Sequence, residues 1–220
     1  MHRVSRLRQW LGSEDLAQAA ASFCGRGLRV VPCHHPTITA GPGGWRTWVC
    51  SCGSPACGAP AEHPVSGHWA EEAIGEPAGT AAWWRREPEH NVGLLTGGDF
   101  EVLDVPGALG RAALARCARR GLSGPVVRTG SGRLHFYVTA MGMPNGFVPS
   151  QPGSGRGGVF WHGEGGWVLA PPSRHLSGGI SRWLQPLERP LPAAHLVLRE
   201  ILDLQDELCG DAAELVAERS

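Results

Sequence analysis

Residues 100–139 read FEVLDVPGALGRAALARCARRGLSGPVVRTGSGRLHFYVT. The apolar run at the start predicts a buried strand, and alanines and leucines at helical spacing over 107–120 predict a helix that ends at Gly121. The apolar runs 125–129 and 134–139 flank a Gly-Ser-Gly turn, which predicts a pair of antiparallel strands. This strand–helix–strand–strand order indicates an α+β fold in which helices cover a mostly antiparallel sheet.

Further elements extend this pattern toward both ends of the chain. We expect a first helix from Ser13 that Gly25 or Gly27 ends, helices over 80–86 and 193–208, and strands over 28–32, 91–96, 157–161 and 166–170. Strands 91–96 and 100–105 are expected to form a hairpin, and 157–161 is expected to pair with 166–170. Residues 33–79 keep neither a strand nor a helix period, so we expect a long irregular insert there.

The composition limits both the class of protein and its compartment. The 220 residues carry 20 basic and 20 acidic side chains, which excludes a histone-like binder but leaves room for a local basic groove. There is no Lys, so a lysine Schiff base and a P-loop are excluded. No apolar run predicts a membrane span, and residues 1–11 lack the apolar core of a signal peptide. Seven cysteines, an odd number, favour free thiols or a metal site in a reducing cytoplasm.

Four soft ligands lie close together in the insert: Cys50, Cys52, Cys57 and His63. Thiolates and imidazole are the donors that tetrahedral zinc prefers, and the Gly and Pro residues between them allow tight turns. The spacing predicts a structural Zn²⁺ site, because four protein ligands leave no open position. The alternative is a loop with incidental thiols. Other residues that could supply a ligand are Cys33, His34, His35 and His68.

Two features of the decisive stretch could carry chemistry. Asp104 lies at the end of an apolar strand, where a carboxylate either binds a metal or only caps the following turn. The segment that includes Ser131, Gly132, Arg133 and His135 combines a Gly/Ser turn, whose N–H groups can approach phosphate oxygens, with a forked guanidinium donor. Its alternative interpretation is a polar hairpin with a half-exposed histidine.

A third feature is the segment 162–175. A Gly-Gly turn precedes an apolar strand and a Pro-Pro pair follows it. This pattern predicts a strand that places Ser173, Arg174 and His175 at the rim of the sheet. The alternative is that Gly-Gly and Pro-Pro only form turns and have no further role.

Taken in order, these pieces resemble the bifunctional DNA primase/polymerase (prim-pol) domain of the archaeo-eukaryotic primase superfamily, in particular its actinobacterial members with a Cys-rich insert. The pieces are strand 28–32, the insert ending at His63-Pro64, Trp83-Trp84, and segments 91–97, 102–105, 129–137 and 165–173. The resemblance implies an RRM-like catalytic core beside an N-terminal αβ module. It implies a domain over 13–190 that contains the insert 33–79, followed by a C-terminal helix and tail over 191–220.

The resemblance also implies a chemistry, which is template-directed nucleotidyl transfer by two divalent ions, Mg²⁺ or Mn²⁺. It places Asp104 at the first carboxylate of an Asp-x-Asp pair. It places His135 at the histidine that holds the phosphates of the incoming nucleotide, with Ser131, Gly132 and Arg133 in the nucleotide-binding turn.

This sequence departs from the family pattern at three positions. The second carboxylate of the family falls on Pro106 and the third falls on Phe160, and neither side chain offers a metal ligand. The lysine that usually precedes His-Pro in the insert falls on Glu62, which would repel a phosphate. Three acids are close in sequence, Asp99, Glu101 and Glu164, and Glu101 or Glu164 is the expected replacement.

Three hypotheses follow from this pattern. The favoured one is a primase/polymerase-like protein with impaired or lost two-metal catalysis that keeps nucleotide or single-stranded DNA binding. The alternatives are an active primase/polymerase, in which Glu101 or Glu164 approaches Asp104, and a non-enzymatic regulatory or scaffolding protein that reuses the fold. Because domains of this family often precede a helicase domain, a separate helicase chain is an expected partner.

Overall fold

The structure, a computed structural model, describes residues 13–40, 42–148 and 158–217. The chain divides into two compact units: the first takes residues up to 95 together with 129–131 and 167–182, and the second takes the rest. Both units combine helices with antiparallel sheets, which confirms the expected α+β class. The expectation about residues 1–11 lies outside the described residues.

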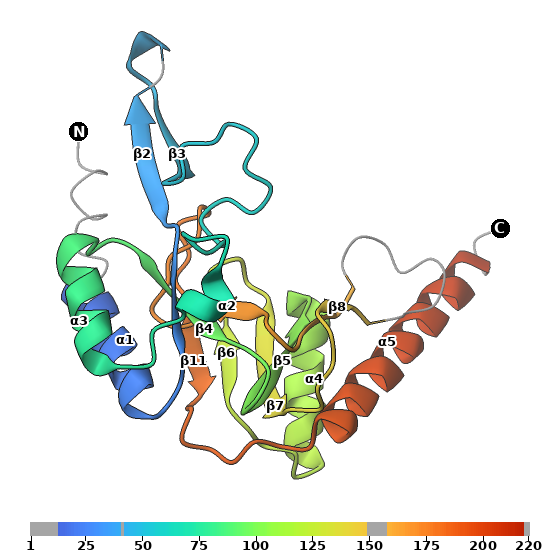
Figure 1. The fold of residues 1–220 in the computed structure, drawn as a ribbon. Helices are drawn as coiled ribbons and strands as arrows, with labels where there is room; N and C mark the ends of the chain where they lie inside the picture. Colours follow the sequence, from blue (N-terminus) through green and yellow to red (C-terminus); the bar gives the residue numbers. More distant parts are fainter. Residues whose placement is uncertain (1–12, 41, 149–157, 218–220) are drawn as a thin grey trace. The chain divides into compact units, whose positions relative to one another are not determined.

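A three-stranded antiparallel sheet forms the centre of the first unit (Figure 1). Its strand order is β1 (Val30–Cys33), β4 (Asn91–Leu95) and β10 (Trp167–Leu169). Helices α1 (Ser13–Gly25) and α3 (Pro77–Arg86) pack against each other, and α1 also contacts β1 and β4. The N-terminal αβ module that the resemblance implies corresponds to these helices and strands.

The helices of this unit form where apolar residues recur at helical spacing. Leu16, Ala20 and Phe23 lie on one face of α1 and are all buried. Burial of a Leu or Phe side chain stabilises the fold by about 1.5–3 kcal/mol. Helix α3 adds Trp84 to the buried residues and begins at Pro77, because a proline in the first turn gives up no helical hydrogen bond. The helix therefore starts three residues earlier than expected.

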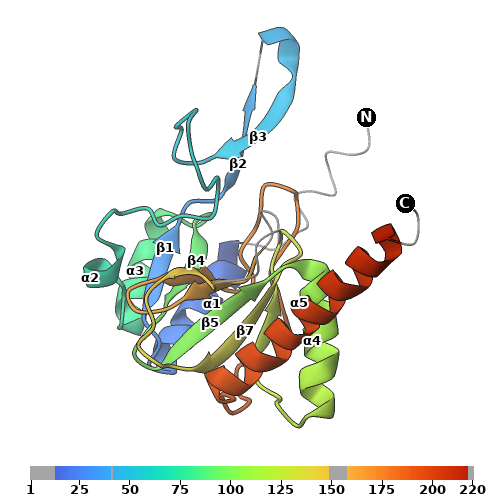
Figure 2. The same ribbon diagram turned by 90° about the vertical axis from the view of Figure 1, so that its right-hand side faces the viewer.

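The insert contains a two-stranded hairpin, so the expectation of an irregular segment is wrong. Strands β2 (Pro36–Ala40) and β3 (Arg46–Cys50) pair in antiparallel fashion across the short turn η2 (Pro42–Gly44), and the one-turn helix α2 (Trp69–Glu72) follows later. Threonines alternate with apolar residues in β2, a pattern that the surrounding Gly and Pro residues obscured. Figure 2 shows the hairpin standing away from α1 and β1.

The second unit is built on a six-stranded sheet with the order β11-β6-β7-β5-β9-β8. Its strands are β5 (Phe100–Val105), β6 (Val126–Arg128), β7 (Leu134–Thr139), β8 (Gly146–Phe147), β9 (Phe160–His162) and β11 (Arg182–Gln185). Helices α4 (Gly107–Arg119) and α5 (Ala194–Ala217) pack together and share a hydrophobic core with alternate strand residues such as Leu103 and Val105. Asp104, between those two residues, therefore lies on the sheet face that points away from the helices.

One of the three expected strand pairs is confirmed and two are wrong. Strands β6 and β7 pair as expected. Strand β4 pairs with β1 and β10 instead of β5, and β9 pairs with β5 and β8 instead of β10. Strand β4 is buried along most of its length and bonded on both edges, so its partners come from distant parts of the chain and not from its neighbour in sequence.

Helix α5 is longer than expected, since it continues to Ala217. It is tied to α4 by ion pairs from Arg116 to Glu200 and to Glu207, each with a 2.8 Å nitrogen–oxygen distance. Among the described helices, none combines the length and the apolar character needed to cross a membrane.

Candidate functional site

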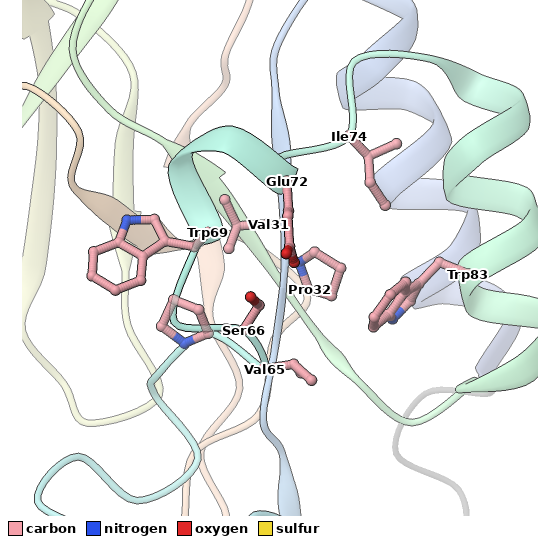
Figure 3. A pocket seen from close by; sticks show the side chains of 9 residues that line it. Val31, Pro32, Val65, Ser66, Trp69, Glu72, Ile74 and Trp83 are labelled. Carbon is pink, nitrogen blue, oxygen red and sulfur yellow. The ribbon is translucent and has the colours of Figure 1, made fainter.

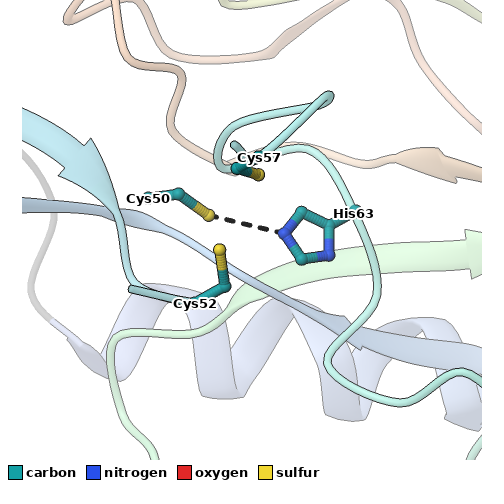
Figure 4. A group of neighbouring side chains, drawn as sticks. All are labelled: Cys50, Cys52, Cys57 and His63. Carbon is teal, nitrogen blue, oxygen red and sulfur yellow. Dashed lines mark hydrogen bonds between the residues drawn. The ribbon is translucent and has the colours of Figure 1, made fainter. Parts of the chain in front are cut away.

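The first candidate site lies at the base of the hairpin (Figure 4). Cys50 is the last residue of β3, Cys52 lies in the turn that follows, and Cys57 and His63 come from the next loop. Their sulfur and nitrogen donor atoms all lie within 4.8 Å of one another. The structure therefore brings together the four residues that the spacing selected.

The geometry of this Cys₃His cluster fits a tetrahedral metal. Cys50 Sγ lies 3.5 Å from His63 Nε2, close to the roughly 3.6 Å that follows from a tetrahedral angle and ordinary zinc–sulfur and zinc–nitrogen bond lengths. The other ring nitrogen, His63 Nδ1, donates to the carbonyl of Pro64 at 3.0 Å, which leaves the lone pair on Nε2. The backbone N–H of Ala61 donates to Cys50 Sγ at 3.2 Å, a bond that favours the thiolate.

The thiols of the cluster differ in acidity. A backbone hydrogen bond from Ser54, aided by His63, lowers the pKa of Cys52 to about 7. Burial raises the pKa of Cys50 to about 11. A metal binds thiolates, so occupation of the cluster would release protons and metal affinity would fall as the pH falls.

The other candidate ligands lie outside this cluster. Cys33 is buried in β1, where burial raises the pKa of its thiol far above the ordinary value. His34 Nδ1 is hydrogen-bonded to Ser51 Oγ at 2.8 Å. His35 lies near His34, and His68 precedes α2. None of the four belongs to the group of donor atoms found among the described residues.

The second candidate site lies on the sheet face of the second unit that points away from α4 and α5. The strand register places Asp104 of β5 opposite His135 of β7 on one side and opposite Phe160 of β9 on the other. Residues paired across antiparallel strands share a face, so the three side chains point in the same direction. Asp104 Oδ1 lies 3.6 Å from His135 Nε2.

A guanidinium group is already bound to this carboxylate. Arg133 Nε donates to Asp104 Oδ1 at 2.7 Å, and Arg133 Nη2 donates to the backbone carbonyls of Asp104 and Gly158 at 3.1 Å each. The ion pair is partly buried, with 29% of the Arg133 side chain and 16% of the Asp104 side chain exposed. Burial raises the pKa of Asp104, and Arg133 opposes that rise. The attraction is stronger here than between exposed charges because less water screens it.

His135 is a neutral and incompletely bonded histidine. Burial, with a smaller contribution from the positive charge of Arg133, lowers its pKa to about 3. Its Nδ1 atom is buried and has no hydrogen-bond partner among the described residues. A buried ring nitrogen of this kind is normally satisfied by a bound ligand or a water molecule.

The structure adds one residue that sequence analysis missed. A nitrogen of His162 lies within 4.8 Å of the donor atoms of both Asp104 and His135, which makes a three-residue group. The rings of His135 and His162 have centroids 5.8 Å apart, and Phe160 contacts His162 with a centroid distance of 4.8 Å. Because His162 lies two residues after Phe160 in a strand, the period of 2 could have indicated that both share the face of Asp104.

Neither candidate replacement carboxylate belongs to this group among the described residues. Glu101 is fully buried, and it accepts hydrogen bonds from Trp161 Nε1 at 2.8 Å and from the N–H of Met143 at 2.9 Å. It lies three positions before Asp104 in β5, so its side chain points to the opposite, helix-covered face. Glu164 lies beside Gly97, in the turn after β9. Among the described residues, no second carboxylate therefore joins Asp104 in this group.

The Gly/Ser turn is held by local bonds. The hydroxyls of Ser131 and Thr129 are hydrogen-bonded at 2.8 Å, and both residues belong to the first unit. Gly132, with φ +92°, has a backbone conformation that suits glycine, and together with Arg133 and His135 it belongs to the second unit. The role of Ser131 and Gly132 in nucleotide binding stays a prediction.

Asn91 joins three segments of the first unit through one side chain. Its Nδ2 donates to the carbonyls of His34, Ala61 and Arg174 at 3.1, 3.0 and 2.7 Å, and its Oδ1 accepts the N–H of Arg174 at 2.8 Å. His34 stands at the start of the insert and Ala61 near the end of its cysteine-rich loop. The asparagine at the start of β4 is thus a buried structural connector.

The segment after β10 is likewise occupied with internal bonds. Ser173 Oγ bonds to the backbone of β4 at 2.9 Å. Arg174 pairs with Glu89 at 2.8 Å, and His175 lies 3.5 Å from Glu62. These contacts favour the structural interpretation of residues 173–175 over a catalytic rim.

A small cavity in the first unit offers no third site for chemistry (Figure 3). Its volume is about 100 Å³, and its walls are mainly apolar, with Val31, Pro32, Trp69 and Trp83 among them. Glu72 is the one charged residue that lines it. A cavity of this size and lining has too few polar groups to orient a nucleotide.

The chain is similar to known proteins in sequence profile and in fold. The family profile described as bifunctional DNA primase/polymerase, N-terminal, matches residues 20–196. Among solved structures, a similar chain is the polymerase domain from Mycobacterium tuberculosis ligase D in complex with DNA, with 13% identity, a TM-score of 0.37, and coverage of 86% of this chain and 88% of that chain. Comparison with curated proteins gives no match.

Proposed function

We propose, since this chain belongs to the bifunctional DNA primase/polymerase family, that it binds nucleotides or single-stranded DNA in DNA replication while its nucleotidyl transfer is impaired or lost. The observation that carries the proposal is the 2.7 Å ion pair between Asp104 and Arg133. Asp104 is the one carboxylate in the group of donor atoms at this centre among the described residues.

Two-metal nucleotidyl transfer needs negative charge that this centre lacks. One ion activates the attacking hydroxyl and the other neutralises the leaving triphosphate, so several carboxylates normally hold the pair. A single carboxylate balances only a fraction of the charge of two divalent ions. Arg133 cancels even that charge and repels a cation from the same oxygen. Pro106 and Phe160 offer no ligand atoms to compensate.

The same residues favour binding of a polyanion. Without metal ions, the charge of a triphosphate or a nucleic-acid backbone must be balanced by the protein, and Arg133 places a guanidinium at the centre. His135 Nδ1, buried and without a partner among the described residues, can bond to a phosphate or sugar oxygen. In this proposal Arg133 and His135 orient the ligand, and Asp104 holds Arg133 in position.

Primer extension tests the loss of catalysis. The wild-type chain, Asp104→Ala, and the restored variant Pro106→Asp/Phe160→Asp would be incubated with primed and unprimed single-stranded DNA, labelled dNTPs, and Mg²⁺ or Mn²⁺. We expect no product from the wild type above the level of Asp104→Ala, and a gain of product in the restored variant. Wild-type product that disappears in Asp104→Ala would overturn the proposal.

Nucleotide binding is measured separately from catalysis. Titration of a fluorescent dNTP into the wild type, without divalent ions, should show saturable binding that weakens about tenfold in His135→Ala, the cost of one charge-assisted hydrogen bond. Absence of saturable binding of both dNTP and single-stranded DNA would leave only the scaffolding hypothesis.

One observation favours an active enzyme as a second candidate. Asp104, His135 and His162 together could hold a single transition-metal ion, because imidazole and carboxylate are suitable donors for such metals. In that case primer extension would depend on Mn²⁺ and would be lost in His162→Ala as well as in Asp104→Ala. Activity with Mn²⁺ that survives His162→Ala would contradict this candidate.

We also propose that the Cys₃His cluster holds a structural Zn²⁺ ion. The support is the donor set, the 3.5 Å sulfur–nitrogen distance and the orientation of His63 by Pro64. When bound, the ion would fix the turns of the insert. The six cysteines that the structure describes form no disulfide, in keeping with a reducing cytoplasm. Elemental analysis of the purified protein should give about one zinc per chain if the four residues form one site.

The domain boundaries remain a further part of the proposal. We propose a primase/polymerase-like domain over 13–190 that includes the insert 33–79, with the C-terminal helix and tail from 191 onward. A helicase would act as a separate partner chain, which co-purification with the full-length protein can test.

A further inference from the structure

The hairpin of the insert exposes large aromatic side chains. Trp45, at the turn, is 77% exposed, and Trp48 and Ile38 on the strands are each 40% exposed. Isolated exposed apolar residues are common on protein surfaces, but two tryptophans within four residues on a projecting hairpin are a concentrated apolar surface. Such a surface is typical of a binding site.

The charge around these tryptophans is one-sided. Residues 16–61 contain no Asp or Glu, although the whole chain has as many acidic as basic residues. Arg46, next to Trp45, is exposed. A surface with aromatic rings, a guanidinium and no acid complements a polyanion with exposed rings, and a single-stranded nucleic acid has both properties.

The strand register gathers three of these groups on one face. Ile38 is paired with Trp48, and Ala40 is paired with Arg46, so these side chains point to the same side of the hairpin, while Trp45 lies at the turn. The opposite face of the paired strands carries Thr37–Val49 and Thr39–Thr47, none of them aromatic. One face therefore combines stacking and charge, and the other is a natural internal control.

We propose that this hairpin binds single-stranded nucleic acid, with bases stacked on Trp45 at the turn and on Trp48 of β3, and a phosphate bound by Arg46. The inference deepens the proposed function, because it rests on nucleic-acid binding and places part of that binding outside the Asp104 centre. Because any base can stack on an aromatic ring, the hairpin binds single-stranded nucleic acid without a strong sequence preference.

The Cys₃His cluster lies at the base of this hairpin. An isolated two-stranded hairpin is marginally stable in water, and β2 and β3 form a sheet of their own. Cys50 ends β3, pairs with Pro36 at the base of the hairpin, and is one of the four clustered ligands. The next backbone N–H, of Ser51, donates to the carbonyl of His35 at 2.9 Å. A metal at this point would fix the end of β3, where it pairs with β2, to the loop that follows.

The experiment measures binding of a fluorescein-labelled 20-nucleotide oligo(dT) to the full-length protein by anisotropy at low salt. We expect Trp45→Ala and Trp48→Ala each to weaken binding about tenfold. Trp45→Phe, which keeps a ring, should stay within about threefold of the wild type. Arg46→Gln should lower the slope of log affinity against log salt by about 0.7, the loss of one phosphate contact.

Two controls separate stacking from misfolding. Thr47→Ala changes the opposite face of the same hairpin and should leave DNA affinity unchanged. Each variant should also keep the wild-type metal content and circular dichroism, since Trp45 and Trp48 are exposed.

The outcomes distinguish this inference from the proposed function. Wild-type DNA affinity in both tryptophan-to-alanine variants would overturn the inference and leave binding at the Asp104 centre standing. No DNA binding by the wild type would also overturn it, and dNTP titration would then decide the proposed function on its own. An equal loss of affinity in Thr47→Ala would overturn it too, because both faces would then matter alike. If the tryptophan variants lose a bound protein partner while their DNA affinity is unchanged, the hairpin binds that protein and not DNA.

Discussion

The two clusters of potential metal ligands in this chain differ in what surrounds them. The Cys₃His cluster has four donor atoms, a backbone N–H on one sulfur, and a histidine whose second nitrogen is anchored by a carbonyl. The Asp104 cluster has three donor atoms, and its carboxylate is already paired with Arg133. Proximity of ligand atoms is therefore not enough, because the charge and hydrogen bonds around them decide whether a cation or an anion is favoured.

The largest expected effect is removal of one ligand from the Cys₃His cluster. Cys57→Ser should reduce the bound metal from about one per chain to a small fraction after dialysis against a chelator, because structural zinc is bound by roughly 10–16 kcal/mol only with its full ligand set. Limited proteolysis should then cut the insert faster than in the wild type.

A buried cysteine outside the cluster provides the control for this experiment. Cys117 lies in the core of the second unit, so Cys117→Ala should keep the metal. Full metal content in Cys57→Ser would remove the distinction between the two clusters.

A second prediction concerns the buried acid that stays outside the Asp104 cluster. Glu101→Gln replaces one acceptor oxygen with an N–H₂ group that faces the donors Trp161 Nε1 and Met143 N–H. We expect a loss of about 2 kcal/mol in the free energy of unfolding, measured by urea denaturation. Glu164→Gln, at an exposed position, should change stability by less than about 0.5 kcal/mol. Equal effects of the two substitutions would show that Glu101 is not the structural acid described here.

The third prediction tests whether Arg133 keeps cations away from Asp104. Arg133→Met removes the charge and keeps much of the length of the side chain, so Mn²⁺ affinity at this cluster should rise about tenfold. Electron paramagnetic resonance of free Mn²⁺ gives the affinity. Arg111→Met, on an exposed part of α4, serves as the charge-matched control and should cause no change. An unchanged affinity in Arg133→Met would mean that missing ligands, and not repulsion, separate the two clusters.

The smallest effect is expected from a histidine near the Cys₃His cluster. Burial, followed by the charges of His90 and Arg174, lowers the pKa of His35 from 6.5 to about 4. As the pH falls, His35 is therefore protonated in the unfolded chain before it is protonated in the folded one. Its contribution lowers the free energy of unfolding progressively from pH 6.5 to about 4 and is negligible above pH 6.5.

Acid unfolding of His35→Phe tests this assignment. The substitution removes the titrating group together with its buried Nδ1, which has no partner among the described residues. The slope of stability against pH should become shallower than in the wild type between pH 6.5 and about 4. An identical slope would assign the acid sensitivity of the first unit to other groups.

The same contrast explains which parts could be predicted from the sequence. The Cys₃His cluster lies within one short segment, so its spacing alone selected the ligands. The β6–β7 pair is also local, and it carried His135 to the centre. The partners of β4 and the position of His162 depend on strands more than fifty residues away, which local patterns do not specify. Arg133 was expected to bind phosphate, and the structure pairs it with Asp104.

The bonds of Asn91 have a consequence for how this protein can evolve. One amide holds the carbonyl of His34 and that of Ala61, and the N–H of His34 donates to the carbonyl of His63 at 2.9 Å, so both ends of the segment 34–63 are fastened at a single point. Once its ends are fixed, lengthening a loop twofold costs only about 0.6 kcal/mol. This segment can therefore change in length and sequence, or be exchanged by recombination, while the sheet that carries it keeps its register.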